Sequence, residues 1–275
     1  MLRRVPLFSM HKVYFLLFVS LLAGLFSCEQ SANQAPVALQ KIAYQYTGEG
    51  QCDTIKRRGV SVSAQYIQLV GESSATKSIN DSLRAMVASG ITDWVDSVDL
   101  AQTPAARTDL ATGARLFSVS YQQMGEEGRM FGGCWDLQVQ CDTAYSSPSI
   151  LTVRQETYTY SGGAHPNTQI SLQSFNRRTG HALQLTEVVS DTTALIGMVE
   201  RAFRKQQDIR PGEDLEAAGY FLRDGQFFLP GTFGIGRDGL IFLYNPYEIA
   251  AYAVGPIQLT VPYSELKDVL QKEVL

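Results

Sequence analysis

The sequence contains little of what a metal centre needs. Its 275 residues include four cysteines and three histidines. The cysteines form no CxxC pair and have no pair of histidines close by, so the ligand spacing of a zinc site is missing. We therefore expect no metal ion and no other cofactor.

A long apolar run is also missing. Residues 13–26 form an apolar run of about 14 residues, fewer than the roughly 20 that an α-helix needs to cross a bilayer. A short apolar run behind a basic start is typical of an export signal, so we predict a signal peptide over residues 1–27. The basic start contains Arg3, Arg4, His11 and Lys12.

The predicted signal ends in Leu25-Phe26-Ser27-Cys28, which resembles the lipobox of bacterial lipoproteins. In that motif the cysteine is lipidated and becomes the first residue of the mature chain. We predict that Cys28 anchors the chain to a lipid bilayer and that residues 28–39 form a polar tether. The alternative is a buried or membrane-embedded thiol. The anchor predicts a location in the bacterial cell envelope, either periplasmic or surface-exposed.

An excess of positive charge is the third absence. The chain has 23 basic and 27 acidic residues, a net charge of −4. Without the three basic residues of positions 1–27, twenty basic residues face 27 acidic ones, a net charge of −7. This balance argues against nucleic acid as a partner, because phosphate binding needs a clustered basic surface. It favours encounter with a basic partner through long-range attraction.

The remaining cysteines suggest one disulfide, because an exported protein meets an oxidising environment. If residues 134–141 form one extended strand, Cys134 and Cys141 lie about 23 Å apart at about 3.3 Å per residue. A disulfide needs a Cα separation of about 4.4–6.8 Å. We therefore expect Cys52 to pair with Cys134 or with Cys141, and the sequence leaves that choice open.

Apolar periodicity predicts a mixture of strands and helices. Residues 41–46 and 60–70 alternate as half-buried strands do, and a change of phase after Tyr66 suggests a β-bulge. Apolar residues then recur at helical spacing over residues 76–98, and a second helix is predicted over residues 105–117. Further strands are predicted at residues 134–141, 150–160, 168–175, 181–185, 226–229, 231–236, 239–244 and 257–261, and further helices at residues 192–207, 213–222 and 263–270.

This order of elements predicts an α+β fold, in which antiparallel sheets pack against helices. We expect two consecutive α+β subdomains, residues 40–148 and 149–275. The glycine-rich residues 231–236 are followed by another strand and not by a helix, so they are not expected to form a phosphate loop.

Two loops contain the candidate binding residues. The first, Tyr-Thr-Tyr-Ser-Gly-Gly-Ala-His-Pro-Asn over residues 158–167, contains Gly162, Gly163 and His165. Its glycines allow a tight reversal. His165 could hold the turn through a backbone carbonyl, bind a ligand or take part in catalysis; no nucleophile elbow is present to support catalysis.

The second loop, residues 244–252, contains Tyr244, Tyr247 and Glu248. Its aromatic residues could line a groove for a glycan or a protein edge, or could pack onto the sheet. Glu248 could also pair with Glu187 or Asp191 as the two carboxylates of a glycosidase. We assign no catalytic residue.

Three segments of the second half resemble a known family. They are Tyr-x-Tyr-Ser-Gly-Gly-Ala-His at 158–165, Thr-Gly with Leu-x-Leu at 179–185, and Asp-Gly-Leu-x-Phe-x-Tyr-Asn-Pro-Tyr-Glu-Ile-Ala-x-Tyr-Ala-x-Gly at 238–255. Together they resemble the extracytoplasmic domains of unknown function shared by RsiV-type anti-sigma factors, which bind lysozyme, and PdaC-type peptidoglycan deacetylases. The resemblance covers roughly residues 150–271, and residues 40–145 resemble the domain that precedes it. Ser161 and Pro166 depart from the family's commoner Thr and Gly.

The resemblance implies an α+β module of the cell envelope. The chain shows neither the anti-sigma transmembrane segment nor the deacetylase domain, so neither activity is expected to carry over. We expect a lipid-anchored binding or structural module, with peptidoglycan fragments or a lysozyme-like protein as candidate partners. The alternative is an enzyme acting on envelope polysaccharide through His165 and Glu248, and the sequence favours the binding module.

Overall fold

The computed structural model describes residues 38–126 and 133–271. The predicted signal peptide, Cys28 and nearly all of the predicted tether lie outside this range. The described residues belong to one compact unit, whose strands form a five-stranded and a three-stranded sheet with helices packed against them. The predicted α+β fold is therefore confirmed.

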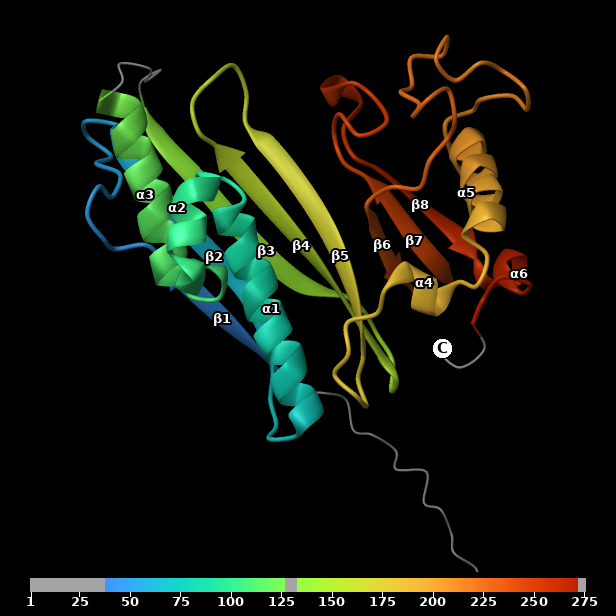
Figure 1. The fold of residues 1–275 in the computed structure, drawn as a ribbon, viewed down its shortest axis with the longest axis horizontal. Coiled ribbons are helices and arrows are strands. Elements are labelled where there is room, and N and C mark those ends of the chain that lie inside the picture. Colours follow the sequence, from blue (N-terminus) through green and yellow to red (C-terminus); the bar gives the residue numbers. More distant parts are fainter. Residues whose placement is uncertain (1–37, 127–132, 272–275) are drawn as a thin grey trace, which may run out of the picture. The chain divides into compact units, whose positions relative to one another are not determined.

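The elements are shown in Figure 1. The strands are β1 (Leu39–Gln45), β2 (Gly59–Leu69), β3 (Cys134–Ser146), β4 (Ile150–Tyr160), β5 (Asn167–Asn176), β6 (Thr232–Ile235), β7 (Gly239–Tyr244) and β8 (Ile257–Pro262). The helices are α1 (Ser74–Thr92), α2 (Ser97–Gln102), η1 (Pro104–Arg107), α3 (Leu110–Glu126), α4 (Leu185–Val188), α5 (Thr192–Gln206), η2 (Tyr252–Val254) and α6 (Tyr263–Leu266). Within the described ranges, no helix combines the length and the apolar character needed to cross a membrane.

The first sheet has the strand order β1-β2-β3-β4-β5. In this sheet only β2 and β3 pair in parallel. A parallel pair needs a long connection, and the segment from α1 to α3 provides it. Helices α1 and α3 cover one face of this sheet (Figure 1). Apolar side chains of that face and of the two helices form its core, which includes Val62, Leu83, Phe117, Leu137 and Val153.

The second sheet has the order β6-β7-β8 and is antiparallel throughout. Its middle strand β7 reads Gly-Leu-Ile-Phe-Leu-Tyr, a continuous apolar run of the kind found in strands that are buried on both faces. Leu240, Phe242 and Tyr244 contribute to the core that includes α5, whereas Leu243 packs on Ile170 of β5. One strand therefore contributes to two apolar clusters.

Buried hydroxyl groups join the two sheets. Ile235 N of β6 donates to Ser174 Oγ over 2.9 Å, and Thr152 Oγ1 donates to Ile235 O over 2.7 Å. The two hydroxyls lie 2.8 Å apart, so both polar groups of Ile235 are satisfied by side chains of the first sheet. A Cβ atom at Gly234 would lie 3.2 Å from Leu172 Cβ, so glycine allows this close approach.

The sheet arrangement differs from the predicted division into subdomains. The predicted boundary between residues 148 and 149 lies in the turn between β3 and β4. These strands pair from Asp136 opposite Tyr160 to Ser146 opposite Leu151. A boundary there would cut the hairpin, so the division between the two sheets comes after β5, which ends at Asn176, and not at the predicted position.

The predicted bulge in β2 is wrong. Pairing of β1 with β2 continues without a shift from Gln45 opposite Ser63 to Leu39 opposite Leu69. Pairing of β2 with β3 ends at Tyr66, and beyond that point β2 is bordered by β1 alone. The change in the apolar pattern therefore marks the end of β3 pairing.

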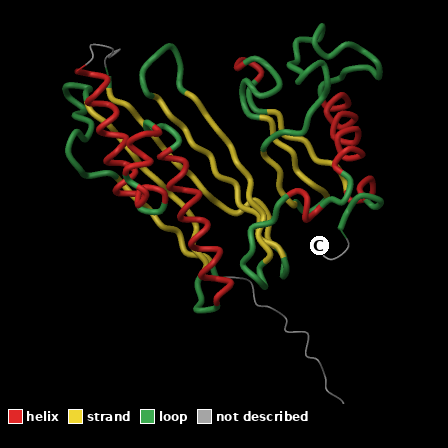
Figure 2. The backbone as a smooth tube through the Cα atoms, in the orientation of Figure 1, coloured by secondary structure: helices red, strands yellow, loops and turns green. Residues whose placement is uncertain are grey.

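Several short elements predicted in the second half are irregular segments. Residues 181–185 and 226–229 contribute isolated β-bridges, and residues 213–222 form turns within the loop region between α5 and β6 (Figure 2). Leu215, Phe227 and Phe228 from this region are buried in the core of the second sheet. Their burial accounts for the apolar pattern, which resembles that of a helix or strand although the backbone forms neither.

Candidate functional site

The first candidate loop, residues 161–166, connects β4 to β5. Gly162 and Gly163 have φ values of 88° and 107°, a region that other residues rarely enter. The Tyr160 hydroxyl donates to Gly163 O over 3.3 Å. The glycines therefore close the turn. His165 lies two residues after Gly163, and its side chain is exposed.

The second candidate loop follows β7 and is fixed by two polar side chains. Asn245 accepts from Ile170 N over 2.7 Å and donates to Ile170 O over 2.9 Å. Glu248 accepts from Gly231 N over 2.8 Å and from Asn245 N over 3.0 Å. Tyr247 lies between them with a φ of 69°, uncommon for a bulky residue, and is 57% exposed. The loop therefore holds an aromatic ring outward in an unfavourable backbone conformation.

The two loops meet in an aromatic cluster. The rings of His165 and Tyr252 stack with centroids 4.1 Å apart and an interplanar angle of 22°. The Tyr252 hydroxyl donates to Pro166 O over 2.9 Å, and the Tyr247 and Tyr252 rings lie 5.6 Å apart. The Tyr247 hydroxyl lies 3.5 Å from His165 Nε2, at the outer limit of a hydrogen bond. We call His165, Tyr247 and Tyr252 the aromatic platform.

The hydrogen bonds of the platform suit binding better than proton transfer. His165 Nδ1 lies 2.8 Å from Pro166 O, and because a carbonyl only accepts, Nδ1 carries the proton in this contact. Within the described residues, no carboxylate is hydrogen-bonded to His165, and both oxygens of Glu248 accept from backbone N–H groups. The two residues of the enzyme hypothesis are therefore not assembled as an acid–base pair.

The other two carboxylates considered for catalysis have separate local roles. Glu187 accepts from Gln184 N over 2.8 Å and lies 2.9 Å from His181 Nε2. The Gln184 N–H group, followed by His181, lowers the pKa of Glu187. Asp191 caps α5 by accepting from Ala194 N over 2.9 Å. Among the described residues, no three His, Cys, Asp or Glu side chains gather as metal ligands would.

Tyr244 is placed differently from the other predicted binding residues. Its side chain is fully buried, and its hydroxyl donates to Phe228 O over 2.6 Å. Burial raises the pKa of Tyr244. The side chain therefore belongs to the core and is closed to a ligand, because alternation along β7 turns it inward with Leu240 and Phe242.

The cysteines lie apart from the platform residues in the sequence and fall into two types. Cys52 and Cys134 form a disulfide with a Cα separation of 5.7 Å, which links the loop before β2 to the start of β3. Cys141 is a buried free thiol, and burial raises its pKa to about 12. At neutral pH this thiol is protonated and unreactive.

Comparison with known proteins finds one family match in the second half of the chain. Residues 188–264 match the DUF3298 family. The proteins of this family are described as having unknown function. The match covers the second sheet and the Tyr247 loop but not the His165 loop. It supports the predicted resemblance at the level of a domain of unknown function. No curated protein matches the chain.

Two solved structures share the fold. A DUF3298 family protein from Pseudomonas aeruginosa is 14% identical, with a TM-score of 0.61 over 88% of this chain and 97% of that chain. A DUF3298 family member from Bacteroides fragilis is 18% identical, with a TM-score of 0.63 over 86% of this chain and 95% of that chain. At these identities the likeness shows the fold alone, and what the platform residues can bind depends on their own geometry.

Tyr252 is the platform residue that sequence reasoning did not select. It stands in the same segment as Tyr247, but nothing in its local pattern distinguishes it from the other tyrosines of that loop. Its hydrogen bond to Pro166 O spans 86 positions in the chain. Only the spatial arrangement of the two loops reveals that Tyr252 supports His165.

Proposed function

We propose that this chain is a lipid-anchored, extracytoplasmic binding module of the bacterial cell envelope, and that its aromatic platform contacts peptidoglycan fragments. The observation that carries the proposal is the platform itself, built by two loops whose backbones are fixed by hydrogen bonds. The conformational cost of holding Tyr247 outward at positive φ is expected where a side chain serves binding.

The chemistry of the platform suits a saccharide. Stacked aromatic rings present faces of negative potential, and the C–H groups of a sugar ring are attracted to such faces. The exposed Tyr247 hydroxyl adds a group that can donate to or accept from a sugar hydroxyl. Because the loops are held in place before binding, little conformational freedom is lost when a ligand docks.

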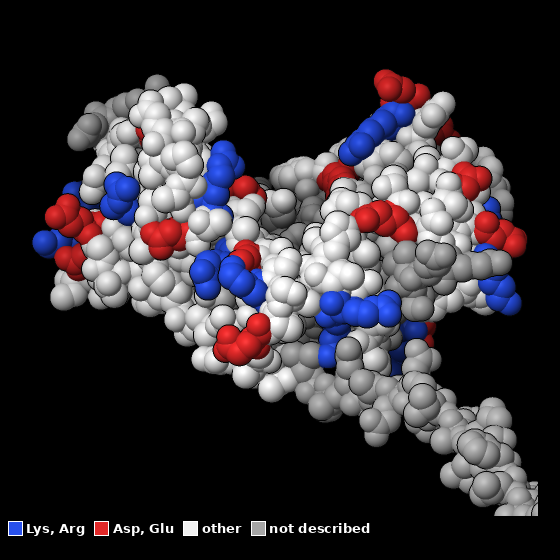
Figure 3. Space-filling model, turned by 60° about the horizontal axis from the view of Figure 1, so that its bottom comes forward, with Lys and Arg blue, Asp and Glu red and all other residues white. Residues whose placement is uncertain are grey.

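A lysozyme-like protein is the second candidate partner, and the charge of the chain favours it. The segment that would remain after signal removal has a net charge of −7. On the face shown in Figure 3, acidic and basic side chains are intermixed, so on this face attraction of a basic protein would act through the net charge and not through one acidic patch. Such attraction weakens as salt screens it, whereas sugar stacking is less sensitive to salt.

Replacing Tyr247 or His165 by alanine is expected to weaken binding of the full chain to soluble peptidoglycan fragments by at least about tenfold, or about 1.4 kcal/mol. The physical reason is loss of the exposed ring in one variant and of the stacking partner of Tyr252 in the other. Isothermal titration at low and high salt measures the affinity for the fragments and, separately, for lysozyme.

Tyr244→Phe is the matched control, because it removes a tyrosine hydroxyl from the same segment at a buried position. Its affinity should equal that of the parent. Absence of binding to both partners at low salt would remove the support for them. Equal affinity in the parent and the Tyr247→Ala variant would show that the platform is not the contact surface.

The proposed anchor has its own test. Cys28→Ser is expected to move the protein from the membrane fraction to the soluble fraction, because the serine cannot take the lipid. Immunoblots of both fractions measure this, with Cys141→Ser as a control that should stay in the membrane fraction. A Cys28→Ser protein retained by the membrane would show that another part of the chain is the anchor.

A further inference from the structure

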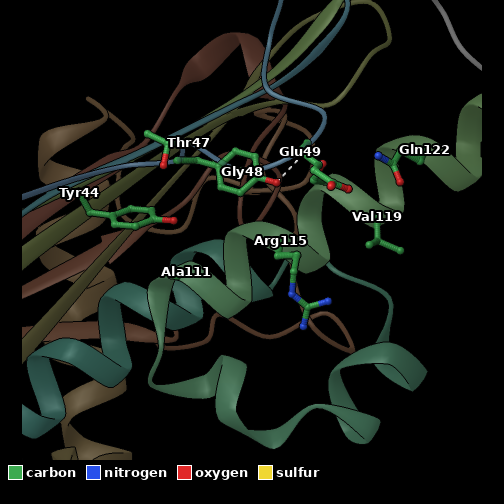
Figure 4. Close-up of a pocket in the computed structure, with 10 residues that line it drawn as sticks. Tyr44, Thr47, Gly48, Glu49, Ala111, Arg115, Val119 and Gln122 are labelled. Carbon is green, nitrogen blue, oxygen red and sulfur yellow. Dashed lines mark hydrogen bonds between the residues drawn. The ribbon is translucent and has the colours of Figure 1, made fainter.

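A pocket of about 460 Å³ lies between the loop that follows β1 and helix α3 (Figure 4). This volume falls within the roughly 300–1,000 Å³ of typical small-molecule sites. Tyr44, Glu49, Arg115, Val119 and Gln122 are among the residues that line it. None of these belongs to the aromatic platform, so the pocket is a separate candidate site.

One wall of the pocket is fixed before any ligand arrives. Tyr46 is buried, and its hydroxyl donates to Glu49 O over 2.6 Å, the bond drawn in Figure 4. Ser118 Oγ of α3 donates to the same carbonyl oxygen over 2.9 Å. The loop backbone is therefore tied at Glu49 O both to Tyr46, which directly follows β1, and to α3, so this wall of the pocket is held in place before a ligand binds.

Two opposite charges line this pocket without neutralising each other. Arg115 from α3 and Glu49 from the loop form no ion pair with one another, nor with any other described residue. Figure 4 shows the Arg115 side chain leaving α3 away from the Glu49 carboxylate. A ligand that bridges the two groups would need an anionic group at one end and a cationic group at the other.

The remaining lining groups suit a peptide between those two charges. The Gln122 amide can donate to a carbonyl and accept from an N–H group, which are the polar groups of a peptide bond. Val119 and the Tyr44 ring offer apolar surface for small side chains. Burial, with Tyr46 and Asp109 nearby, raises the pKa of Tyr44, so its phenol stays neutral and can donate.

We infer that this pocket binds a short peptide through its free ends, with Arg115 holding the terminal carboxylate and Glu49 the terminal ammonium. The planar guanidinium matches a carboxylate with two parallel N–H donors. Recognition of both ends selects short peptides over the interior of a longer chain. The inference does not depend on the function proposed for the aromatic platform.

The test is a titration of the full chain with trialanine, with its C-terminal amide and with its N-acetyl form. Trialanine is expected to bind, and both modified forms are expected to bind at least about tenfold more weakly, because each lacks one terminal charge. Arg115→Gln should weaken the binding of trialanine by at least about tenfold. It should also remove the difference in affinity between trialanine and its C-terminal amide. Glu49→Gln should likewise remove the difference between the free and the N-acetyl forms.

Arg84→Gln is the matched control, since Arg84 is an exposed arginine of α1 that does not line the pocket; it should bind trialanine as the parent does. Tyr247→Ala should also leave the affinity for trialanine unchanged, so a negative result at the pocket can be told apart from a negative result at the aromatic platform. Equal affinity for the acid and the amide, or no binding of trialanine, would overturn the inference. If a variant does not fold, the test rests on the parent chain alone, through the ratio of its affinity for trialanine to its affinity for the amide and for the N-acetyl form.

Discussion

Removal of the Cys52–Cys134 disulfide is expected to lower the free energy of unfolding by about 4 kcal/mol. The bond joins cysteines 82 positions apart, so it closes a long loop of the unfolded chain. Such a closure lowers the entropy of the unfolded state and thereby stabilises the folded one. Urea unfolding of the Cys52→Ala, Cys134→Ala double variant measures the loss.

Cys141→Ala is the control for this experiment, because it removes a buried thiol and leaves the disulfide intact. It should cost about 1 kcal/mol through lost packing. Adding a reductant should destabilise the parent and the Cys141→Ala variant by the same amount, and should not affect the double variant. A loss below about 1 kcal/mol in the double variant would show that the bond does not constrain the unfolded chain as described.

Asn245→Ala is expected to lower the free energy of unfolding by about 3 kcal/mol and to weaken binding at the platform. The Asn245 side chain satisfies both backbone groups of Ile170, which is buried in β5. Alanine leaves an N–H and a carbonyl there without this partner, at about 1–3 kcal/mol each. The loop carrying Tyr247 also loses its tie to the first sheet. Thermal unfolding and peptidoglycan titration measure the two effects.

The chain contains a matched control for this variant. Asn80 of α1 uses its side chain in the same way, accepting from Leu69 N over 2.8 Å and donating to Leu69 O over 2.9 Å. Asn80→Ala should therefore cost a similar free energy of unfolding and leave the affinity for peptidoglycan fragments unchanged. If both variants weakened binding equally, the loss would reflect general destabilisation and not the position of the Tyr247 loop.

Several regular elements were predictable where the apolar pattern was long, although the helical pattern over residues 76–98 covers α1 and the start of α2 and not one helix. The alternation in residues 150–160 predicts β4 with the observed bounds, and the unbroken apolar run in β7 matches a strand buried on both faces. Prediction failed in residues 213–229, where Leu215, Phe227 and Phe228 pack on the core from an irregular backbone. Burial there produces an apolar pattern without a regular period in the backbone.

The candidate site was predictable by residue type but not by arrangement. The glycines before His165 and the aromatic residues around Tyr247 indicate exposed, shaped loops. Tyr244 was selected with them, although period-two alternation with Leu240 and Phe242 would have turned it inward. Contacts between distant segments, such as Tyr252 with Pro166, leave no local signal in one sequence.

The pocket beside α3 was not predictable for the same reason. Glu49 and Arg115 lie in segments that are far apart in the chain, and neither stands in a recognisable motif. Their convergence depends on the pairing of β1 with β2 and on the packing of α3 against β2. Such sites emerge only when the strands are assembled.

The loops of His165 and Tyr247 are proposed to act as one binding surface. A double-mutant cycle with His165→Ala, Tyr247→Ala and the double variant tests this proposal most directly, with the affinity for peptidoglycan fragments as the measured quantity. Residues of one surface should show a coupling energy of at least about 0.5 kcal/mol, because each ring supports the contact made by the other. Strictly additive losses, or no loss in any of the three variants, would contradict a shared surface.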